Sequence, residues 1–499
     1  MTNKIIKFAK DNWIFLSILI IGILFRTYKP IQSYMYTHDQ DLAGWIVKDI
    51  LVNKHLRLIG QETSSQGVFI GPLFYYLQIP FYLLTKMDPS GTIFLVTMLG
   101  VLTIFSFFFC FSKMFGKKVG FIASFIYAVT MYYVNTDREI VPTMPVYLWS
   151  VWFFYGTWLI LKGKSRAYVF LGFLSGFIWN FNLALATVVP LVAVAQILSK
   201  TKINFKHIFL GIVVFVVTMS PYFVFEARHS SRLTKAIISS LITPKDFTVG
   251  TGRGLAKLDR VFQLVHKNVD SIVWGPIRPL PKHWTLYLLI IIFVFLYKRR
   301  IVPKDICLIM FLWLLAYIAF FTVNSIDVSE YYLNGMNIVW ILIISLWINY
   351  LLKNKNSVKR ETAILILVMI GVLGLYGLLT KSINRSGYLD RKAVVKFIKE
   401  DSQKQGYPCV SVSYITSPGN DLGYRYFYWL EKMHVNKPIS NSPVYSIVFP
   451  HSMVDRIDKS FGALGLVLPD YAKYNKEDVD KSCLGENKNL TEPMFGYTQ

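Results

Sequence analysis

The sequence predicts an all-α membrane protein that crosses the bilayer many times and ends in a small α/β domain. Of its 499 residues, 54% are hydrophobic and only 16% are charged, whereas soluble domains carry about 25% charged residues. The apolar residues are gathered in long runs, while the C-terminal part is polar. A net charge of +24 would suit a nucleic-acid partner in a soluble protein. Here many of the basic residues lie in short loops between apolar runs, so we expect no nucleic-acid binding.

Apolar segments recur along the first three quarters of the chain. We expect about eleven spans, several near the roughly 20 residues that a bilayer requires, at residues 13–27, 92–113, 119–134, 142–161, 167–181, 183–198, 208–225, 284–297, 305–323, 333–352 and 361–380. The basic start and the short first segment are also features of a signal peptide. No small-residue cleavage site follows, so we predict an uncleaved first span.

Basic residues divide the connecting loops into two sets. Clusters of Lys and Arg occur at the N-terminus and in every second loop, at residues 4–10, 113–118, 162–166, 200–206, 298–304 and 353–360. The positive-inside rule places these clusters, and the N-terminus, in the cytoplasm. The outer side then receives residues 28–91, 135–141, 226–283 and 324–332, together with the C-terminal region from about residue 381.

Residues 71–86, "GPLFYYLQIPFYLLTK", are apolar but contain Pro72 and Pro80. A proline inside a helix costs roughly 3 kcal/mol, and a span here would invert the orientation of every later loop. We therefore expect a re-entrant or interfacial segment in the outer leaflet. A complete span is the alternative.

The C-terminal region has mixed periodicity. "YLDRKAVVKFIKED" has helical spacing, and "CVSVSYIT" and "YSIVFP" are typical of strands. We expect a transmembrane domain over residues 1–384 and an extracytoplasmic α/β domain over residues 385–499. Cys409 and Cys483 would form a disulfide if this domain lies outside the cytoplasm; two unrelated thiols are the alternative.

Two acids follow the first span, in "YTHDQDLAGWIVKD". Asp39 and Asp41 stand at the start of a segment with helical spacing of Leu42, Trp45 and Ile46, which predicts a helix lying flat on the membrane. One interpretation is that an acid here caps the helix. The other is that it faces an outer cavity and performs chemistry.

A second acidic segment, "NTDREIVPTMP", contains Asp137 and Glu139. It lies in the next outer loop, so its carboxylates could reach the same cavity as Asp39. Carboxylates from two loops suit a general base or a divalent metal such as Mg²⁺ or Mn²⁺. The chain has no CxxC or HExxH pattern, which argues against zinc bound by Cys or His.

The long outer loop 226–283 is basic. An outer basic surface beside apolar helices suits an amphiphile with an anionic head, such as a lipid phosphate. Tyr331 and Tyr332, at another outer helix end, would add hydroxyl groups, although interfacial aromatic residues are the simpler interpretation. The candidate ligands of the phosphate are Arg138, Arg253, Lys257, Arg260, Tyr331 and Tyr332.

Several motifs resemble those of the GT-C superfamily of membrane glycosyltransferases. They are "DQ" after the first span, "WIVKDIL", "LIGQETSSQGVFIGPLFYYL", the basic turn "SKMFGKK" and "DREIVPTMP". The sequence is most similar to the family-39-like and Rgt-like enzymes, which are related to protein O-mannosyltransferases and to the aminoarabinose transferase of lipid A. The resemblance covers residues 10–225 well and the later spans mainly by topology.

The resemblance implies the GT-C fold and a sugar donor carried on a polyprenyl phosphate. It implies that Asp39 activates an acceptor hydroxyl on the extracytoplasmic face, with Asp41, Asp137 or Glu139 assisting or holding a metal. The acceptor would be a lipid, a glycan or a protein. The chain departs from relatives at Ala43, where a longer motif has aspartate, and at "IGPL", where the lysine of "KPPL" is missing.

Two other functions fit a chain of this class. A transporter or flippase of lipid-linked sugars would place charges near the middle of the bilayer, whereas here they cluster at helix ends. A non-catalytic scaffold for the C-terminal domain would have little reason to carry the "GPLFYYL" block. Many Lys and Asn with few Ala are typical of an AT-rich bacterial genome, so we expect the protein in a bacterial cytoplasmic membrane.

Overall fold

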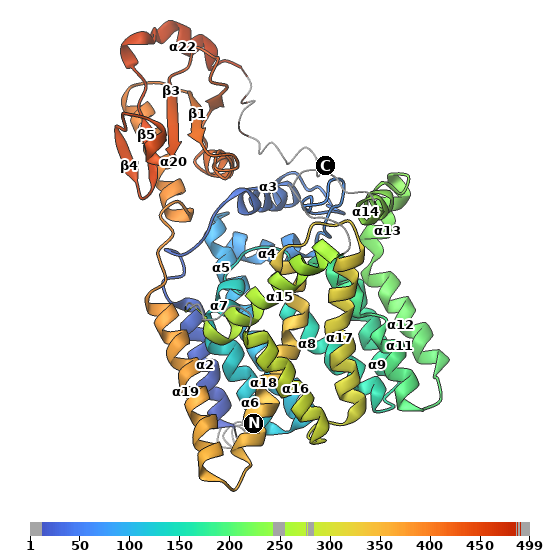
Figure 1. Ribbon diagram of the computed structural model, residues 1–499. Coiled ribbons are helices and arrows are strands. Elements are labelled where there is room, and N and C mark those ends of the chain that lie inside the picture. Colours follow the sequence, from blue (N-terminus) through green and yellow to red (C-terminus); the bar gives the residue numbers. More distant parts are fainter. Residues whose placement is uncertain are drawn as a thin grey trace, which may run out of the picture.

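The computed structural model describes residues 12–242, 255–275, 277, 284–485, 487 and 490. A bundle of helices forms most of the molecule, and a small α/β unit built around α20 and β1–β5 stands at one end of it (Figure 1). The predicted all-α membrane protein with a small C-terminal sheet is confirmed.

The first half of the bundle contains short helices between the long ones. Its elements are α2 (Trp13–Thr27), α3 (His38–Val52), α4 (Leu73–Leu84), η1 (Pro89–Gly91), α5 (Thr92–Phe115), α6 (Lys117–Val129), α7 (Met131–Thr136), α8 (Val146–Leu161), α9 (Ala167–Gly176), α10 (Ile178–Phe181), η2 (Leu183–Val188) and α11 (Leu191–Ser199).

The second half of the bundle ends in the long apolar helices α17, α18 and α19. Its elements are α12 (Phe205–Thr218), α13 (Ser220–Arg228), α14 (Arg232–Ile242), α15 (Leu255–Trp274), α16 (Trp284–Lys298), α17 (Lys304–Val323), η3 (Glu330–Met336), α18 (Asn337–Leu352) and α19 (Ser357–Leu379).

All the apolar segments predicted from the sequence contain helix, but several of them are broken. Within the described residues, four helical stretches are long and apolar enough to cross a membrane singly, at Pro89–Phe115, Lys304–Val323, Glu330–Leu352 and Ser357–Leu379. The pair α12 and α13 would be a fifth, bent by 58°. Pro221, in the first turn of α13, accounts for the break because it has no N–H to continue the α12 ladder.

The two ends of the bundle differ in chemistry. The basic turns between α16 and α17 and between α18 and α19 lie at the lower end in Figure 1, on the side where the described chain begins. The helices α3 and α4 and the α/β unit lie at the opposite end. Helix α4, with Pro80 inside it, has only 12 residues. At ~1.5 Å per residue, 12 residues are too short to cross a bilayer.

Close contacts between helices require glycine at several points. A Cβ added at Gly172 of α9 would lie 2.1 Å from the carbonyl oxygen of Gly211 in α12. Any larger residue there would force these two helices apart, which explains how α9 and α12 pack backbone to backbone.

The C-terminal unit is an α/β layer. Helix α20 (Tyr388–Lys404) packs on β4 and β5 of a five-stranded sheet of order β2-β1-β3-β5-β4, in which β2, β1 and β3 are parallel and the pairs of β5 are antiparallel. The remaining elements are β1 (Val410–Thr416), α21 (Arg425–Leu430), β2 (Val435–Asn436), β3 (Val444–Phe449), η4 (His451–Met453), β4 (Lys459–Phe461), β5 (Leu464–Val467), η5 (Tyr471–Lys473) and α22 (Lys476–Ser482).

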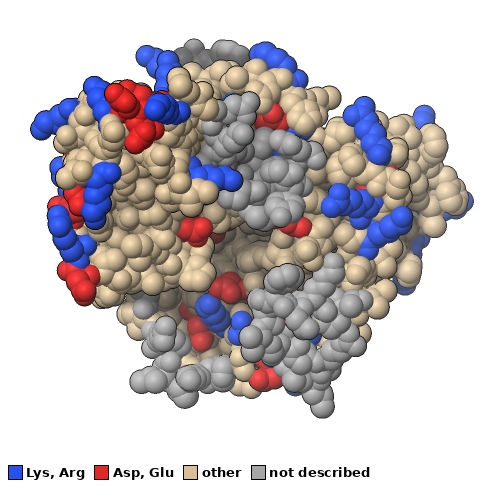
Figure 2. Space-filling model, turned by 90° about the horizontal axis from the view of Figure 1, so that it is seen from above, with Lys and Arg blue, Asp and Glu red and all other residues tan. Residues whose placement is uncertain are grey.

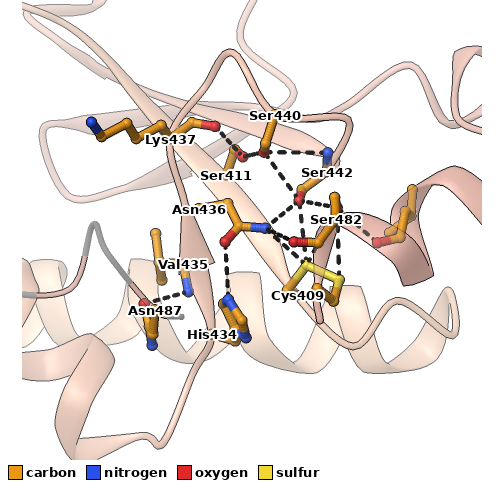
Figure 3. Close-up of a disulfide and its surroundings, with 12 residues drawn as sticks. Cys409, Ser411, His434, Val435, Asn436, Lys437, Ser440, Ser442, Ser482 and Asn487 are labelled. Atoms are coloured by element: carbon orange, nitrogen blue, oxygen red, sulfur yellow. Dashed lines mark hydrogen bonds between the residues drawn. A yellow bond between two sulfur atoms is a disulfide. The ribbon is translucent and has the colours of Figure 1, made fainter. Parts of the chain in front are cut away.

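A disulfide joins the start of β1 to the end of α22. Cys409 and Cys483 are bonded, with Cα atoms 5.6 Å apart, as the sequence suggested. Hydrogen-bonded polar side chains surround the bridge (Figure 3), and Ser442 Oγ lies 2.8 Å from Ser482 Oγ and 2.7 Å from Asn436 Nδ2. These bonds compensate the burial of polar groups beside the sulfur atoms.

The apolar core of the C-terminal unit does not stop at residue 385. One cluster of buried residues contains Val410, Phe427 and Ile447 of this unit, and it also contains Tyr36, Phe74 and Leu95 from the bundle end. The unit is therefore packed onto the bundle rather than tethered beside it.

Candidate active site

A cavity of about 540 Å³ opens at the end of the bundle that carries α3. Figure 2, viewed toward this end, shows a hollow flanked by Asp and Glu side chains. One wall is polar and comes from the start of α3, residues 61–65 and the two tyrosines of η3. The rest of the lining is mostly apolar and includes Pro142, Phe181, Leu183, Leu241, Phe320, Phe321 and Ile326. Phe321 lies directly beside the polar part, with its ring stacked on Tyr332.

Asp39 lies in the polar wall. Thr37 is the N-cap of α3, and its backbone N–H donates to Gln40 Oε1 over 2.9 Å. Asp39 is thus the second residue of the helix and not its N-cap, although it still belongs to the acidic first turn. Its Oδ1 accepts a hydrogen bond of 3.0 Å from Gln61 Nε2. The buried Tyr75 hydroxyl donates to Gln61 Oε1 over 3.0 Å, which sets the direction of that amide.

The segment "GQETSSQGVFIG", residues 60–71, folds as a hairpin that forms the polar wall. Its backbone bonds include Gly60 N–H to the Ile70 carbonyl at 2.7 Å and Thr63 N–H to the Val68 carbonyl at 2.7 Å. Trp179 Nε1 donates to the Phe69 carbonyl at 2.7 Å and ties the hairpin to α10. Glu62 and Ser64 project from it into the lining.

Glu139 also lines the cavity. Its side chain is open to the cavity, but the surrounding protein limits its hydration and raises its pKa to about 7. The nearby Lys381 donates to Asn135 Oδ1 over 2.8 Å. Burial and the charge of Arg138 lower the pKa of Lys381 to about 8. Glu139 in the cavity lining and Lys381 near it therefore change charge near neutral pH.

Asp137, two residues from Glu139, is not part of the lining. It is buried and accepts hydrogen bonds from Arg26 Nε at 2.8 Å and the Tyr127 hydroxyl at 2.6 Å. Arg26 also donates to the Gly22 and Ala128 carbonyls. This closed network joins α2 to the loop after α7, so the position suits a structural ion pair.

Asp41 also lies outside the lining. It is fully buried behind the first turn of α3. Its Oδ1 accepts the backbone N–H of Tyr426 at 3.1 Å and the Tyr36 hydroxyl at 3.3 Å. Because residues two positions apart on a helix point in different directions, Asp39 faces the cavity, whereas Asp41 faces the C-terminal unit.

The basic residues expected at a phosphate do not come together. Arg138 donates to the Tyr28 carbonyl and to Ser33 Oγ, Lys257 donates to Asn324, and Arg260 is exposed on α15. None of these three lines the cavity. Arg253 lies outside the described residues. Tyr331 and Tyr332 do line the cavity, and the Tyr332 hydroxyl lies 2.5 Å from Ser64 Oγ.

Three carboxylates, Asp39, Glu62 and Glu139, line the cavity. In the part of the chain that the structure describes, however, no three His, Cys, Asp or Glu side chains are close enough together to hold a metal ion. The residues present do not fit a closed metal site, and we derive no chemical step through a metal.

Sequence reasoning missed Gln61, Glu62 and Ser64. All three stand in the "LIGQETSSQGVFIGPLFYYL" block that carries the resemblance, where one proline and five glycines or serines interrupt the apolar pattern. A loop with polar side chains beside apolar helices is a place where binding groups are often found. The polar side chains of this block were therefore the sequence feature that could have identified these residues.

Residues 70–225 match the family model described as dolichyl-phosphate-mannose-protein mannosyltransferase. Among solved structures, ArnT from Cupriavidus metallidurans, crystallised with undecaprenyl phosphate, aligns with a TM-score of 0.61 at 11% identity, over 94% of this chain and 99% of ArnT.

The chain has the GT-C fold.

The apo structure of the same ArnT aligns equally well, with a TM-score of 0.61 at 10% identity over 94% of this chain and 99% of that one. The oligosaccharyltransferase of Archaeoglobus fulgidus, in complex with zinc and sulfate, aligns with a TM-score of 0.49 at 12% identity, over 87% of this chain and 67% of its own. No curated protein sequence matches the chain significantly. The GT-C resemblance is confirmed, and the family match together with the GT-C fold supports a multi-pass membrane glycosyltransferase and does not favour a transporter.

Proposed function

We propose that the chain transfers one sugar from a polyprenyl-phosphate donor to an acceptor hydroxyl, with Asp39 as the general base. The observation that carries this proposal is the place of Asp39: its carboxylate stands in the polar wall of a cavity whose remaining lining is mostly apolar, and Gln61 orients it. An apolar lining suits a polyprenyl chain, and the ligand named in the ArnT structure, undecaprenyl phosphate, supports a donor of that class.

The reaction follows from these groups. Asp39 takes the proton of the acceptor hydroxyl as the oxygen attacks the anomeric carbon of the sugar. The bond between that carbon and the phosphate oxygen breaks, and the polyprenyl phosphate leaves with the electron pair. Attack opposite to the leaving group inverts the anomeric configuration. The sugar is a hexose or a pentose, and the acceptor is a lipid, a glycan or a protein.

The leaving phosphate requires donors or positive charge. We assign Tyr331, Tyr332 and Ser64 as hydroxyl donors, because they meet at the cavity wall. Arg253, a candidate from the sequence, stays a prediction because it lies outside the described residues. Glu139, elsewhere in the cavity lining, assists Asp39 in the transfer. The mechanism assigns no step to a divalent metal, and the EDTA reaction described below tests whether transfer requires one.

We further propose that the cavity faces the extracytoplasmic side of a bacterial cytoplasmic membrane. The basic turns lie at the opposite end of the bundle, as the positive-inside rule requires for the cytoplasmic side. A disulfide in the unit beside the cavity supports the same orientation, because disulfides persist in oxidising compartments.

The test uses the purified full chain in liposomes, a panel of radiolabelled polyprenyl-phosphate sugars and a membrane extract as acceptor. The wild type should transfer label from at least one donor, and Asp39→Asn should lose transfer by at least about 10²-fold with an unchanged melting temperature. EDTA in a parallel reaction tests the metal. Normal transfer by Asp39→Asn would refute the base. Donor translocation without transfer would favour the flippase.

A further inference from the structure

The C-terminal unit contacts the back of the helix that carries Asp39. Tyr426, at the start of α21, lies against α3 and donates its backbone N–H to the buried Asp41. The Tyr426 ring packs on Trp45 of the same helix, with centroids 6.3 Å apart. The first turn of α3 is therefore held by a residue that is 385 positions away in the chain.

The Tyr426 ring lies too close to Gly44 of α3 for a larger residue at that position. A Cβ added at Gly44 would lie 2.8 Å from the Tyr426 ring. The Tyr426 hydroxyl in turn donates to the Met87 carbonyl over 2.9 Å, so the same residue bridges α3 and the turn after α4. Through Tyr426, α3 is held against the C-terminal unit and linked to the turn after α4.

A second set of bonds keeps the unit in place. Lys392 forms an ion pair with Asp88, and the Tyr388 hydroxyl donates to the same carboxylate at 2.6 Å. The Tyr388 backbone N–H donates to the Tyr34 carbonyl at 3.1 Å. The unit is thus attached both to the turn after α4 and to the segment that leads into α3.

We propose that the C-terminal unit is a positioning element for Asp39, and that Asp41 is the positioning residue through which it acts. Asp41 and Asp39 belong to the same helical turn, so a shift of that turn displaces the carboxylate in the cavity. The inference rests on the proposed role of Asp39. A charged acceptor holds the Tyr426 N–H more strongly than a neutral one, and a displacement of about 1 Å in a catalytic group can cost about 10²-fold in rate.

The test measures kcat and the donor KM for the full chain in liposomes, per folded protein. Asp41→Ala should lower kcat about 10- to 100-fold, while the donor KM changes less than about threefold. Asp41→Asn should recover most of the rate, because its amide oxygen still accepts the Tyr426 N–H. Gly44→Ala, which leaves both carboxylates intact, should also lower kcat. Arg456→Ala, an exposed position of the same unit, is the control and should retain the wild-type rate.

A double variant separates positioning from an independent contribution. If Asp41 acts through Asp39, Asp39→Asn with Asp41→Ala should be no slower than Asp39→Asn alone. A wild-type kcat in Asp41→Ala, or additive losses in the double variant, would overturn the inference. If Asp41→Ala does not fold, a wild-type kcat in Gly44→Ala would do the same. Normal transfer by Asp39→Asn would instead refute the proposed base.

Discussion

Asp39 and Asp137 are carboxylates near the same end of the bundle, but their surroundings are opposite. Asp39 is partly open in the cavity wall and has one side-chain donor, Gln61. Asp137 is fully enclosed and accepts from Arg26 and Tyr127. A group that exchanges protons with a substrate must be reachable, whereas a buried ion pair is weakened most by losing one partner.

Asp137→Asn should therefore change stability more than chemistry. Removing one charge of a buried pair costs about 3–5 kcal/mol, because the Arg26 guanidinium is left without its counter-charge. The melting temperature in detergent should fall clearly, while the rate per folded molecule stays within a few fold of wild type. Asp39→Asn should show the reverse pattern, and equal effects of the two variants would contradict the assignment.

Glu139 predicts a pH dependence of donor binding. Its raised pKa of about 7 means that it gains negative charge as the pH rises from 6 to 8, and Lys381, with a pKa of about 8, then loses positive charge. Both changes disfavour a phosphate in the cavity. A like charge nearby costs on the order of 1 kcal/mol in a hydrated site, or ~fivefold in affinity.

The donor KM of the wild type should therefore rise across pH 6 to 8. Glu139→Gln removes the first ionisation, so its KM should stay flat until Lys381 titrates near pH 8. Initial rates at several donor concentrations and at constant ionic strength provide the measurement. Identical pH profiles for the two proteins would show that Glu139 does not face the donor.

The hairpin of residues 60–71 is the element on which the polar wall depends. It is anchored at its end by Gly71, whose N–H donates to the Trp179 carbonyl at 3.1 Å. Asn180 Oδ1, beside it, accepts the Leu73 N–H at 3.1 Å and starts α4. The hairpin, α4 and α10 therefore meet at one residue without a side chain.

Gly71→Ala should displace the hairpin and lower transfer. Its Cβ would lie 2.2 Å from Asn180 Oδ1 and 3.0 Å from the Trp179 ring, and overpacking of this kind costs about 1–3 kcal/mol. Transfer rate and melting temperature should both fall. Gly371→Ala is a matched control, because its Cβ meets only Phe125 at 3.4 Å and should have little effect. Wild-type transfer by Gly71→Ala would show that the hairpin adapts.

At the scale of the whole molecule, a shared core joins the C-terminal unit to the bundle, and a disulfide stabilises the unit itself. Cys409 and Cys483 are 74 positions apart in the chain, and closing a loop of this length stabilises a fold by about 4 kcal/mol in the chain-entropy model. Because the unit holds α3, loosening the unit should displace Asp39 in the cavity lining.

The double variant Cys409→Ser with Cys483→Ser should therefore melt at a lower temperature than wild type and should transfer sugar more slowly near its transition. Dithiothreitol should reproduce both effects in the wild type and should change nothing in the variant. Unchanged melting and transfer after reduction, verified by thiol titration, would show that the bonds of Tyr426, Lys392 and Tyr388 hold the unit without the bridge.

The sequence by itself determined the class of the protein and the alternation of basic loops along the chain, and it offered Asp39 and the pair Cys409 and Cys483 as candidates. Hydropathy and loop charge act on each segment separately, so they can be interpreted without knowing the neighbours. Only the tertiary structure decided which polar groups meet in the cavity. Asp39 and Asp41 are two positions apart, as are Asp137 and Glu139, yet one member of each pair lines the cavity and the other is buried behind it. Which carboxylate of each pair lines the cavity depends on the direction in which it points from its helical turn. It also depends on partners that are distant in the chain, Tyr426 and Arg26. A local pattern of residues reveals neither.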